Sequence, residues 1–470
     1  MAKRQDVAWS LPPLSRKSPM FRSINPSTGD EIATYPELTA NEVDAKIARA
    51  VKRFASWRFS PVAERTALLE KIAEEFDARL EPMARMASLE MGKTLVSSRA
   101  ELQKCAAAFR YYAQNGEAFL TPQPIAGVNG EVHLLPLGPI LAVMPWNFPY
   151  WQVIRFVAPT ILAGNVGLLK HASIVQGVAG MIEDAVIAAG APEGLFQNLA
   201  IKSDKVASLI ADDRIAAVTL TGSEGAGRSV AEAAGKALKK VVLELGGSDP
   251  FIVMPSADID KAAKVAVIAR IQNSGQSCVC AKRMIVHAEV YDAFAEKFVA
   301  GMLAAKAGDP MDASSDMGPL SSFEQKETVL GQLEEAKAAG AKLVGGEALA
   351  GEGAYIGGGV LTGVTVDSAL AHEEIFGPIA MLFKVADIDE AIRVANAIPF
   401  GLGSSVWTHD KGEEARFIAG IEAGMTAVNQ MLASMPEAPF GGTKRSGHGR
   451  ELGQWGLHEF MNTKTVLRAN

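Results

Sequence analysis

The chain has 470 residues, of which 48% are hydrophobic and 21% are charged, a composition typical of a folded globular protein with two or three domains. Its formal net charge of −7 argues against a protein that binds nucleic acid or an anionic membrane. Three cysteines are too few for a disulfide framework, and no apolar run reaches the roughly 18–20 residues of a membrane span. We therefore expect a cytoplasmic protein with no nucleic-acid or membrane partner.

The N-terminal third of the chain is expected to be mainly helical. Residues 1–20 read as an N-terminal extension, because their apolar residues are too few and too interrupted for a signal sequence. A strand and turn follow from Phe21 to Asp30, and the pair Thr39 and Glu42 has the spacing of a capping box that starts a helix. Further helices are predicted from Pro61 and Pro82, and a fourth places Cys105 among apolar residues as a core thiol.

From Gly138 the pattern changes to apolar strands that alternate with helices. Strands are predicted over 140–144, 165–170, 216–220 and 241–245. Continuous apolar strands separated by helices predict a doubly wound parallel sheet, in which ligands bind outside the carboxyl ends of the strands. The polar residues at those ends are Asn147, Lys170, Thr221-Gly222-Ser223 and Glu244. A second alternating region, from Pro250 to about Ser434, predicts a second α/β domain, and residues 462–467 read as a final strand.

Cys278 stands near the start of this second region, after the small polar run 273–277. A thiol is a useful nucleophile only as the thiolate, and small residues before it would let a substrate and backbone N–H groups approach the sulfur. Taken alone, however, a cysteine in a chain of this length is more often a small buried hydrophobic residue than a nucleophile. The role of Cys278 therefore depends on what the other segments supply.

Four other polar positions leave two interpretations open. Residues 221–227 follow a strand and open a helix, but without the G-x-G-x-x-G spacing they fit a phosphate loop or an ordinary tight turn. Lys170 fits a ligand of ribose or a solvated lysine. Glu244 fits a base with a raised pKa or an ion-paired carboxylate, and Asn147 fits an oxyanion donor or a turn residue. We find no metal-ligand spacing and no G-x-S-x-G motif.

Together, several longer motifs resemble the aldehyde dehydrogenase superfamily, over about residues 21–467. They are 145–149 (PWNFP), 243–247 (LELGG), 275–278 (GQSC), 373–378 (EEIFGP) and 439–442 (PFGG). The resemblance implies a doubly wound NAD(P)-binding domain, a second α/β catalytic domain and a small β oligomerisation arm. We expect the NAD(P)-binding domain to comprise residues 21–128 and 146–246. The catalytic domain would comprise residues 247–434, and the arm residues 129–145 and 453–470. Such an arm implies a homodimer or homotetramer.

The resemblance also implies a role for each candidate residue. Cys278 would form a thiohemiacetal with an aldehyde and then a thioester, Asn147 would hold the oxyanion, and Glu244 would activate the hydrolytic water. The implied cofactor is NAD or NADP, with binding residues Trp146, Lys170, Ser173, Gly222, Ser223, Glu374 and Phe376. Ser173 stands where a glutamate often excludes NADP, so its hydroxyl is compatible with a 2′-phosphate.

Within the superfamily the chain is most similar to the bacterial branch that oxidises succinate semialdehyde to succinate. The resemblance then assigns the substrate's distal carboxylate to Arg155, whose guanidinium suits bidentate pairing. Gln272 replaces an arginine common in that branch, and Ser434 is a candidate helper. Alternative functions are a broader aliphatic or aromatic aldehyde dehydrogenase and a non-catalytic binding protein on the same fold.

Cys280 raises a separate hypothesis, a regulatory disulfide with Cys278, because similar pairs are proposed in that branch. A fully extended pair at this spacing lies about 7 Å apart, near the limit of disulfide reach, so the loop would have to bend.

Overall fold

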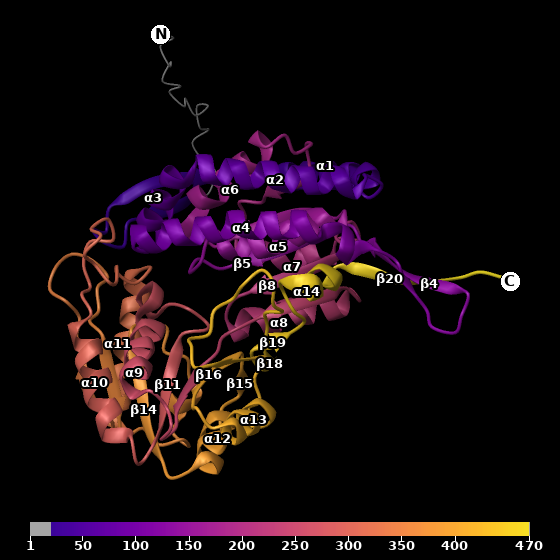
Figure 1. Cartoon of the computed structure of the whole chain (residues 1–470). Coiled ribbons are helices and arrows are strands. Elements are labelled where there is room, and N and C mark those ends of the chain that lie inside the picture. Colours follow the sequence, from indigo (N-terminus) through magenta and orange to yellow (C-terminus); the bar gives the residue numbers. More distant parts are fainter. Residues whose placement is uncertain (1–19, 470) are drawn as a thin grey trace, which may run out of the picture.

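The computed structural model describes residues 20–469, so all but the last residue of the predicted N-terminal extension lies outside the described part. Two α/β domains lie against each other, and a narrow β arm extends to one side (Figure 1). Among the described helices, none combines the length and apolar character needed to cross a lipid bilayer.

The first domain is built on a six-stranded sheet with the strand order β19-β9-β8-β5-β6-β7. Its strands are β5 (Pro139–Met144), β6 (Val166–His171), β7 (Phe196–Asn198), β8 (Ala217–Thr221), β9 (Lys240–Glu244) and β19 (Gly447–His448). All neighbouring strands are parallel except β19, which pairs antiparallel with β9. This arrangement confirms the predicted doubly wound sheet.

Apart from the short α7, the helices of this domain are those expected from the apolar spacing, and α4 packs between α2 and α5 (Figure 1). They are α1 (Ala40–Trp57), α2 (Val62–Ala78), α3 (Leu80–Met91), α4 (Leu95–Leu120), α5 (Trp151–Ala163), α6 (Gln176–Ala188), α7 (Val206–Ala211) and α8 (Glu224–Lys236). The predicted capping box starts α1, with the Glu42 N–H donating to Thr39 Oγ1 and the Thr39 N–H donating to the Glu42 carboxylate. Cys105 is fully buried in α4, as predicted.

The second domain contains a seven-stranded sheet with the order β12-β13-β14-β11-β10-β16-β17. Its strands are β10 (Asp249–Val253), β11 (Ala281–His287), β12 (Lys342–Gly345), β13 (Gly359–Thr362), β14 (Ile379–Val385), β16 (Gly403–Trp407) and β17 (Met425–Val428). Its helices are α9 (Ile259–Ile271), α10 (Tyr291–Ala304), α11 (Phe323–Ala338), α12 (Ile388–Asn396) and α13 (Lys411–Gly420). Successive residues of β10 enter different apolar clusters, with Phe251 facing α9 and α10 and Ile252 facing α11 to α13.

The arm is a three-stranded sheet of β3 (Gln123–Pro124), β4 (Gly130–Pro136) and β20 (Met461–Leu467), with β20 at one edge. Both predicted arm segments, residues 129–145 and 453–470, are longer than the arm itself. Residues 139–144 form β5, whose buried apolar residues lie at the centre of the first sheet, and α14 (Gly453–Glu459) packs on α5 in the body of the domain. The intervening residues 435–452, which the prediction left unassigned, return to the first sheet through β19 and form β18 (Thr443–Lys444), the partner of β15 (Phe400–Gly401).

The N-terminal hairpin of β1 (Met20–Ile24) and β2 (Glu31–Pro36) is joined to the body by a buried carboxylate, Glu90. Glu90 accepts hydrogen bonds from Ser23 Oγ at 2.7 Å and from the N–H groups of Gly177 and Val178 at 2.9 and 3.0 Å, in the first turn of α6. Burial nevertheless raises the pKa of Glu90 to about 7.

We expect the Glu90 carboxyl to make thermal stability depend on pH. Between pH 4.5 and 7 Glu90 ionises in the unfolded chain but keeps its proton in the folded protein. The free energy of unfolding should therefore fall by about 3 kcal/mol as the pH rises from 4.5 to 7. Thermal melts of Glu90→Gln and wild-type protein at several pH values would test this. The Tm difference between them should change over that window, and a constant difference would contradict the expectation.

Candidate active site

The polar residues predicted at strand ends do meet at one edge of the first sheet. Asn147 follows β5, Gly222 and Ser223 follow β8, Glu244 ends β9, and these three strands are neighbours. Because the carboxyl ends of parallel strands share an edge, the chain turns of all three face the second domain. A cavity of about 340 Å³ lies there, lined in part by Asn147, Gly222, Ser223 and Cys278.

Cys278 is delivered to this cavity by an unusual loop after α9. Asn273, Ser274 and Gly275 all have positive φ (52°, 56° and 75°), a conformation that costs free energy for the two non-glycine residues. A Cβ at Gly275 would lie 2.3 Å from the Gly377 carbonyl, so only glycine fits there. A turn closed by the Cys280 N–H and the Ser277 carbonyl at 3.2 Å then leaves Cys278 partly exposed while Cys280 is fully buried.

Side-chain amides hold this loop against the first domain. The Asn273 Nδ2 donates to the Asn147 carbonyl at 2.7 Å, and the Asn147 Nδ2 donates to the Gln276 carbonyl at 3.0 Å. The Gln152 Nε2 donates to Asn147 Oδ1 at 2.9 Å, which fixes the orientation of the Asn147 amide. The Asn147 amide is thus buried, oriented and next to the cysteine, as an oxyanion donor needs to be.

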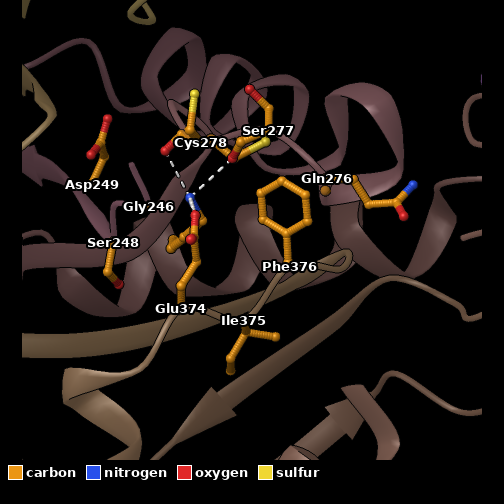
Figure 2. A network of polar contacts seen from close by, with 12 residues as sticks. Gly246, Ser248, Asp249, Gln276, Ser277, Cys278, Glu374, Ile375 and Phe376 are labelled. Carbon is orange, nitrogen blue, oxygen red and sulfur yellow. Dashed lines mark hydrogen bonds and ion pairs between the residues drawn. The ribbon is translucent and has the colours of Figure 1, made fainter. Parts of the chain in front are cut away.

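Lys282 is a component of the site that the sequence analysis did not single out. Its buried ammonium donates to the Ser277 and Cys278 carbonyls at 3.0 and 2.8 Å and pairs with Glu374 at 2.8 Å. Figure 2 shows Glu374 directed toward the loop of Ser277 and Cys278, with Phe376 beside it. Lys282 therefore joins the loop of Ser277 and Cys278 to the segment that carries Glu374 and Phe376, two of the residues predicted to bind the cofactor.

Glu244 lies in a buried cluster with Arg155 and Glu451, and Glu451 was not among the predicted site residues. The Arg155 Nε pairs with Glu451, its Nη2 donates to Thr221 Oγ1 at 3.1 Å, and its guanidinium lies 4.7 Å from the centroid of the Phe440 ring. Within the described residues, neither carboxyl oxygen of Glu244 has a hydrogen-bond partner. Burial and the neighbouring Glu451 charge hold the pKa of Glu244 well above its usual range.

The residues predicted to hold a substrate carboxylate already have other partners. Arg155 is only 2% exposed and already paired with Glu451, so binding a second carboxylate would require that ion pair to open, and its predicted role stays a prediction. The Gln272 side chain folds back on α9, with Nε2 3.4 Å from the Ala269 carbonyl. Ser434 Oγ accepts hydrogen bonds from Lys104 Nζ at 2.8 Å and from Trp151 Nε1 at 3.0 Å.

The two cysteines of the loop are free thiols. Burial raises the pKa of Cys278 to about 12, against the opposing effect of the positive charges on Arg155 and Lys282. The thiol is therefore neutral at pH 7, contrary to the low-pKa setting expected of a nucleophile. The loop does bend between the two cysteines, and the regulatory disulfide stays a prediction.

Five of the cofactor-binding candidates line the cavity: Trp146, Gly222, Ser223, Glu374 and Phe376. The Trp146 and Phe376 rings meet edge to face at 5.7 Å beside Cys278, and Ser223 caps the N-terminus of α8. The Nζ of Lys170, on β6, donates to Ser203 Oγ at 3.2 Å, and the exposed Ser173 follows three residues later in the chain. A surface groove of about 630 Å³ between α7 and α8 is lined largely by small side chains: Ala207, Ala211, Ser229, Ala233 and Ala237.

A doubly wound domain whose strand ends meet a second domain at one cavity, with a cysteine beside an oriented amide, is the arrangement of a dehydrogenase. The chain belongs to the aldehyde dehydrogenase family, whose family model matches residues 14–466. This finding confirms the predicted family and fold class.

Several members of the family are similar over nearly their full length. The succinate-semialdehyde dehydrogenase [NADP(+)] of Mycolicibacterium paratuberculosis (strain ATCC BAA-968 / K-10) is 51% identical over 451 residues, which are 94% of this chain and 96% of that protein. Succinate-semialdehyde dehydrogenase [NADP(+)] 1 of Mycobacterium tuberculosis (strain ATCC 25618 / H37Rv) is 51% identical over 450 residues, 94% and 98% of the two chains. The crystal structure of succinic semialdehyde dehydrogenase from Streptococcus pyogenes in complex with NADP+ has a TM-score of 0.93 and 39% identity, over 96% of this chain and 100% of that one.

Proposed function

We propose that this enzyme oxidises succinate semialdehyde to succinate with NADP. The observation that carries the proposal is the cavity in which the oriented Asn147 amide and the Cys278 thiol meet, with Glu244 at the end of the neighbouring strand. The names of relatives 51% identical to this chain support the choice of substrate and cofactor.

In the first half of the reaction the Cys278 thiol releases its proton to solvent, and the resulting thiolate sulfur adds to the aldehyde carbon. The carbonyl π electrons move to the oxygen, and the resulting negative charge is stabilised by the Asn147 amide and the Cys278 backbone N–H. A nicotinamide bound beside Phe376 would supply the acceptor for the hydride. Loss of that hydride re-forms the C=O bond and leaves a thioester on Cys278.

In the second half Glu244 acts as the base for hydrolysis. The Glu244 carboxylate takes a proton from water while the water oxygen adds to the thioester carbon, and departure of the Cys278 sulfur yields the carboxylate product. Since burial raises the pKa of Glu244, this carboxyl must first lose its own proton, so turnover is expected to increase with pH over a range higher than that in which an ordinary glutamate titrates.

The residues predicted to bind the cofactor suit the 2′-phosphate of NADP. Lys170 and Ser203 lie together, and Ser173 provides a hydroxyl where a carboxylate would repel the phosphate. Gly222 and Ser223 lie at the N-terminus of α8, which suits the pyrophosphate, and Glu374 suits the nicotinamide ribose. NAD is the alternative cofactor.

The remaining proposals concern assembly and location. The outer edge of β20 in the arm suits strand pairing with a second copy of the chain, in a homodimer or homotetramer. We place the enzyme in the cytoplasm because its cysteines are free thiols and its charge is moderate.

A panel of substrates and cofactors tests the proposed function. We expect purified protein to reduce NADP with succinate semialdehyde at a kcat/KM at least about 10-fold above that with butanal, which has the same chain length but no carboxylate, because a buried charge-assisted contact contributes about 1.5–3 kcal/mol. NAD is run in parallel. Equal rates with butanal would instead favour a broad aldehyde dehydrogenase, and no turnover of any aldehyde would favour a binding protein.

A further inference from the structure

Lys282 is a lysine of the second sheet whose side chain is completely buried. It is the second residue of β11, which lies between β10 and β14. An ammonium has three N–H groups, and three oxygens surround this one: the Ser277 carbonyl at 3.0 Å, the Cys278 carbonyl at 2.8 Å and the Glu374 carboxylate at 2.8 Å (Figure 2). The same ammonium therefore holds the backbone of the nucleophile and a carboxylate that lines the cavity.

The Glu374 carboxylate depends on Lys282 for its position. The Glu374 side chain is 19% exposed, and a Cβ at Gly246 would lie 2.4 Å from its Oε2, so the glycine leaves the space that this oxygen occupies. In the part of the chain that the structure describes, Lys282 is the sole ion-pair partner of this carboxylate, and no other group donates a hydrogen bond to it. Without the ammonium the carboxylate would be free to turn toward solvent.

Asp249, the other carboxyl group near this ammonium, does not take the place of Glu374. Among the described residues Asp249 lies beyond ion-pair distance of Lys282, and its Oδ1 accepts a hydrogen bond from the Gly403 N–H at 3.1 Å. Burial raises the pKa of Asp249 to about 7, so this carboxyl is partly protonated at pH 7. The buried ammonium is thus paired with Glu374, the one of the two carboxylates that lines the cavity.

We propose that Lys282 is a positioning residue for hydride transfer: it holds Glu374 where this carboxylate accepts the hydroxyl groups of the nicotinamide ribose, and it fixes that contact relative to Cys278. The inference rests on the proposed function and deepens it. Because one ammonium binds both the Cys278 carbonyl and Glu374, the residue that carries the thiohemiacetal and the residue that orients the hydride acceptor keep a constant separation. A shift of about 1 Å between reacting groups can slow a reaction about 100-fold.

A binding measurement tests Lys282 without turnover. Calorimetry compares NADP with adenosine 2′,5′-bisphosphate, which has the 2′-phosphate but lacks the nicotinamide ribose. We expect Lys282→Met to bind NADP about 3- to 10-fold more weakly than wild-type protein and the bisphosphate equally well. Lys384→Met, the same change at a half-exposed lysine on the neighbouring strand β14, should bind both ligands like the wild type. Unchanged NADP binding by Lys282→Met, or an equal loss with both ligands, would overturn the proposal.

First-turnover kinetics test the effect on hydride transfer. Lys282→Met should form the first NADPH about 10- to 100-fold more slowly, with little change in the KM for succinate semialdehyde. Deuterium at the aldehyde carbon should slow this variant more than it slows the wild type. Glu374→Gln should cause a similar loss, and the double variant should be little slower than either single variant, because Lys282 acts through Glu374.

Additive losses in the double variant, or an unchanged isotope effect, would overturn the role of Lys282. Lys282→Gln keeps N–H donors for the Ser277 and Cys278 carbonyls without the charge, and should show the same losses if Lys282→Met fails to fold. A wild-type protein that oxidises no aldehyde would instead overturn the proposed function, whereas the comparison of NADP with the bisphosphate requires no aldehyde and still decides whether Lys282 positions Glu374.

Discussion

Cys278→Ser should lower aldehyde oxidation by about 10⁴-fold or more, because a serine hydroxyl in this site has neither the acidity nor the nucleophilicity of a thiol. The substitution is nearly isosteric, so the loop that carries residue 278 should keep its hydrogen bonds to Lys282 and the Asn147 region, which involve backbone carbonyls. Steady-state NADPH formation measures the loss. Mass spectrometry of wild-type protein mixed with aldehyde should show a covalent adduct that Cys278→Ser cannot form.

Cys280→Ser is the matched control for this experiment. Cys280 is fully buried two residues away, and its thiol donates to the Gln272 carbonyl at 3.6 Å, a contact that a hydroxyl can also make. We expect at most a few-fold loss of activity. A Cys278→Ser enzyme that retained a tenth of wild-type activity, or an adduct on Cys280 in place of Cys278, would contradict the assignment of the nucleophile.

Glu244→Gln should lower steady-state turnover by about 10²- to 10⁴-fold, the usual contribution of a general base. The amide cannot accept the proton of the hydrolytic water, whereas thioester formation on Cys278 does not require this base. The first turnover should therefore release up to one NADPH per active site in a rapid burst, and a thioester should accumulate. Stopped-flow absorbance and mass spectrometry of the quenched enzyme measure both.

The pH dependence separates a chemical role of Glu244 from a structural one. Because the pKa of this carboxyl is held well above its usual range, wild-type turnover should rise with pH over a range higher than that of an ordinary glutamate, and Glu244→Gln should lose that rise. Glu81→Gln, the same change at an exposed ion pair on α3, should behave like the wild type. Loss of the burst together with turnover would place Glu244 before the thioester instead of after it.

Much of the fold and the cavity could be predicted because strand ends are visible in a sequence. Apolar runs of five or six residues locate β5, β8 and β9, and the polar residues that follow them necessarily share one sheet edge. The error in the arm arose at Gly138, where strand β4 gives way to β5 after only two intervening residues. The apolar run 140–144 itself indicates a strand of the first sheet, so the sequence places the end of the arm at Gly138.

The charge pairing could not be predicted, since it depends on contacts between distant segments. Arg155 and Glu451 are brought together by the return of residues 435–452 to the first sheet, and Lys104 meets Ser434 in the same way. Lys282 had a local signal, because it is a lysine four residues after the cysteine. Its ion pair with Glu374, however, depends on a segment about 90 residues further along the chain. Such pairings decide which cations remain available to a substrate.

The left-handed loop before Cys278 is fastened to both halves of the molecule. Its Asn273 amide holds the Asn147 carbonyl of the first domain, and the Arg270 guanidinium donates to the Ile375 and Gly377 carbonyls of the second. Three consecutive residues of positive φ persist only while both sets of contacts exist. The catalytic centre is consequently a late product of folding: neither domain can build it alone, and the thiol acquires its final environment only after the two domains have docked.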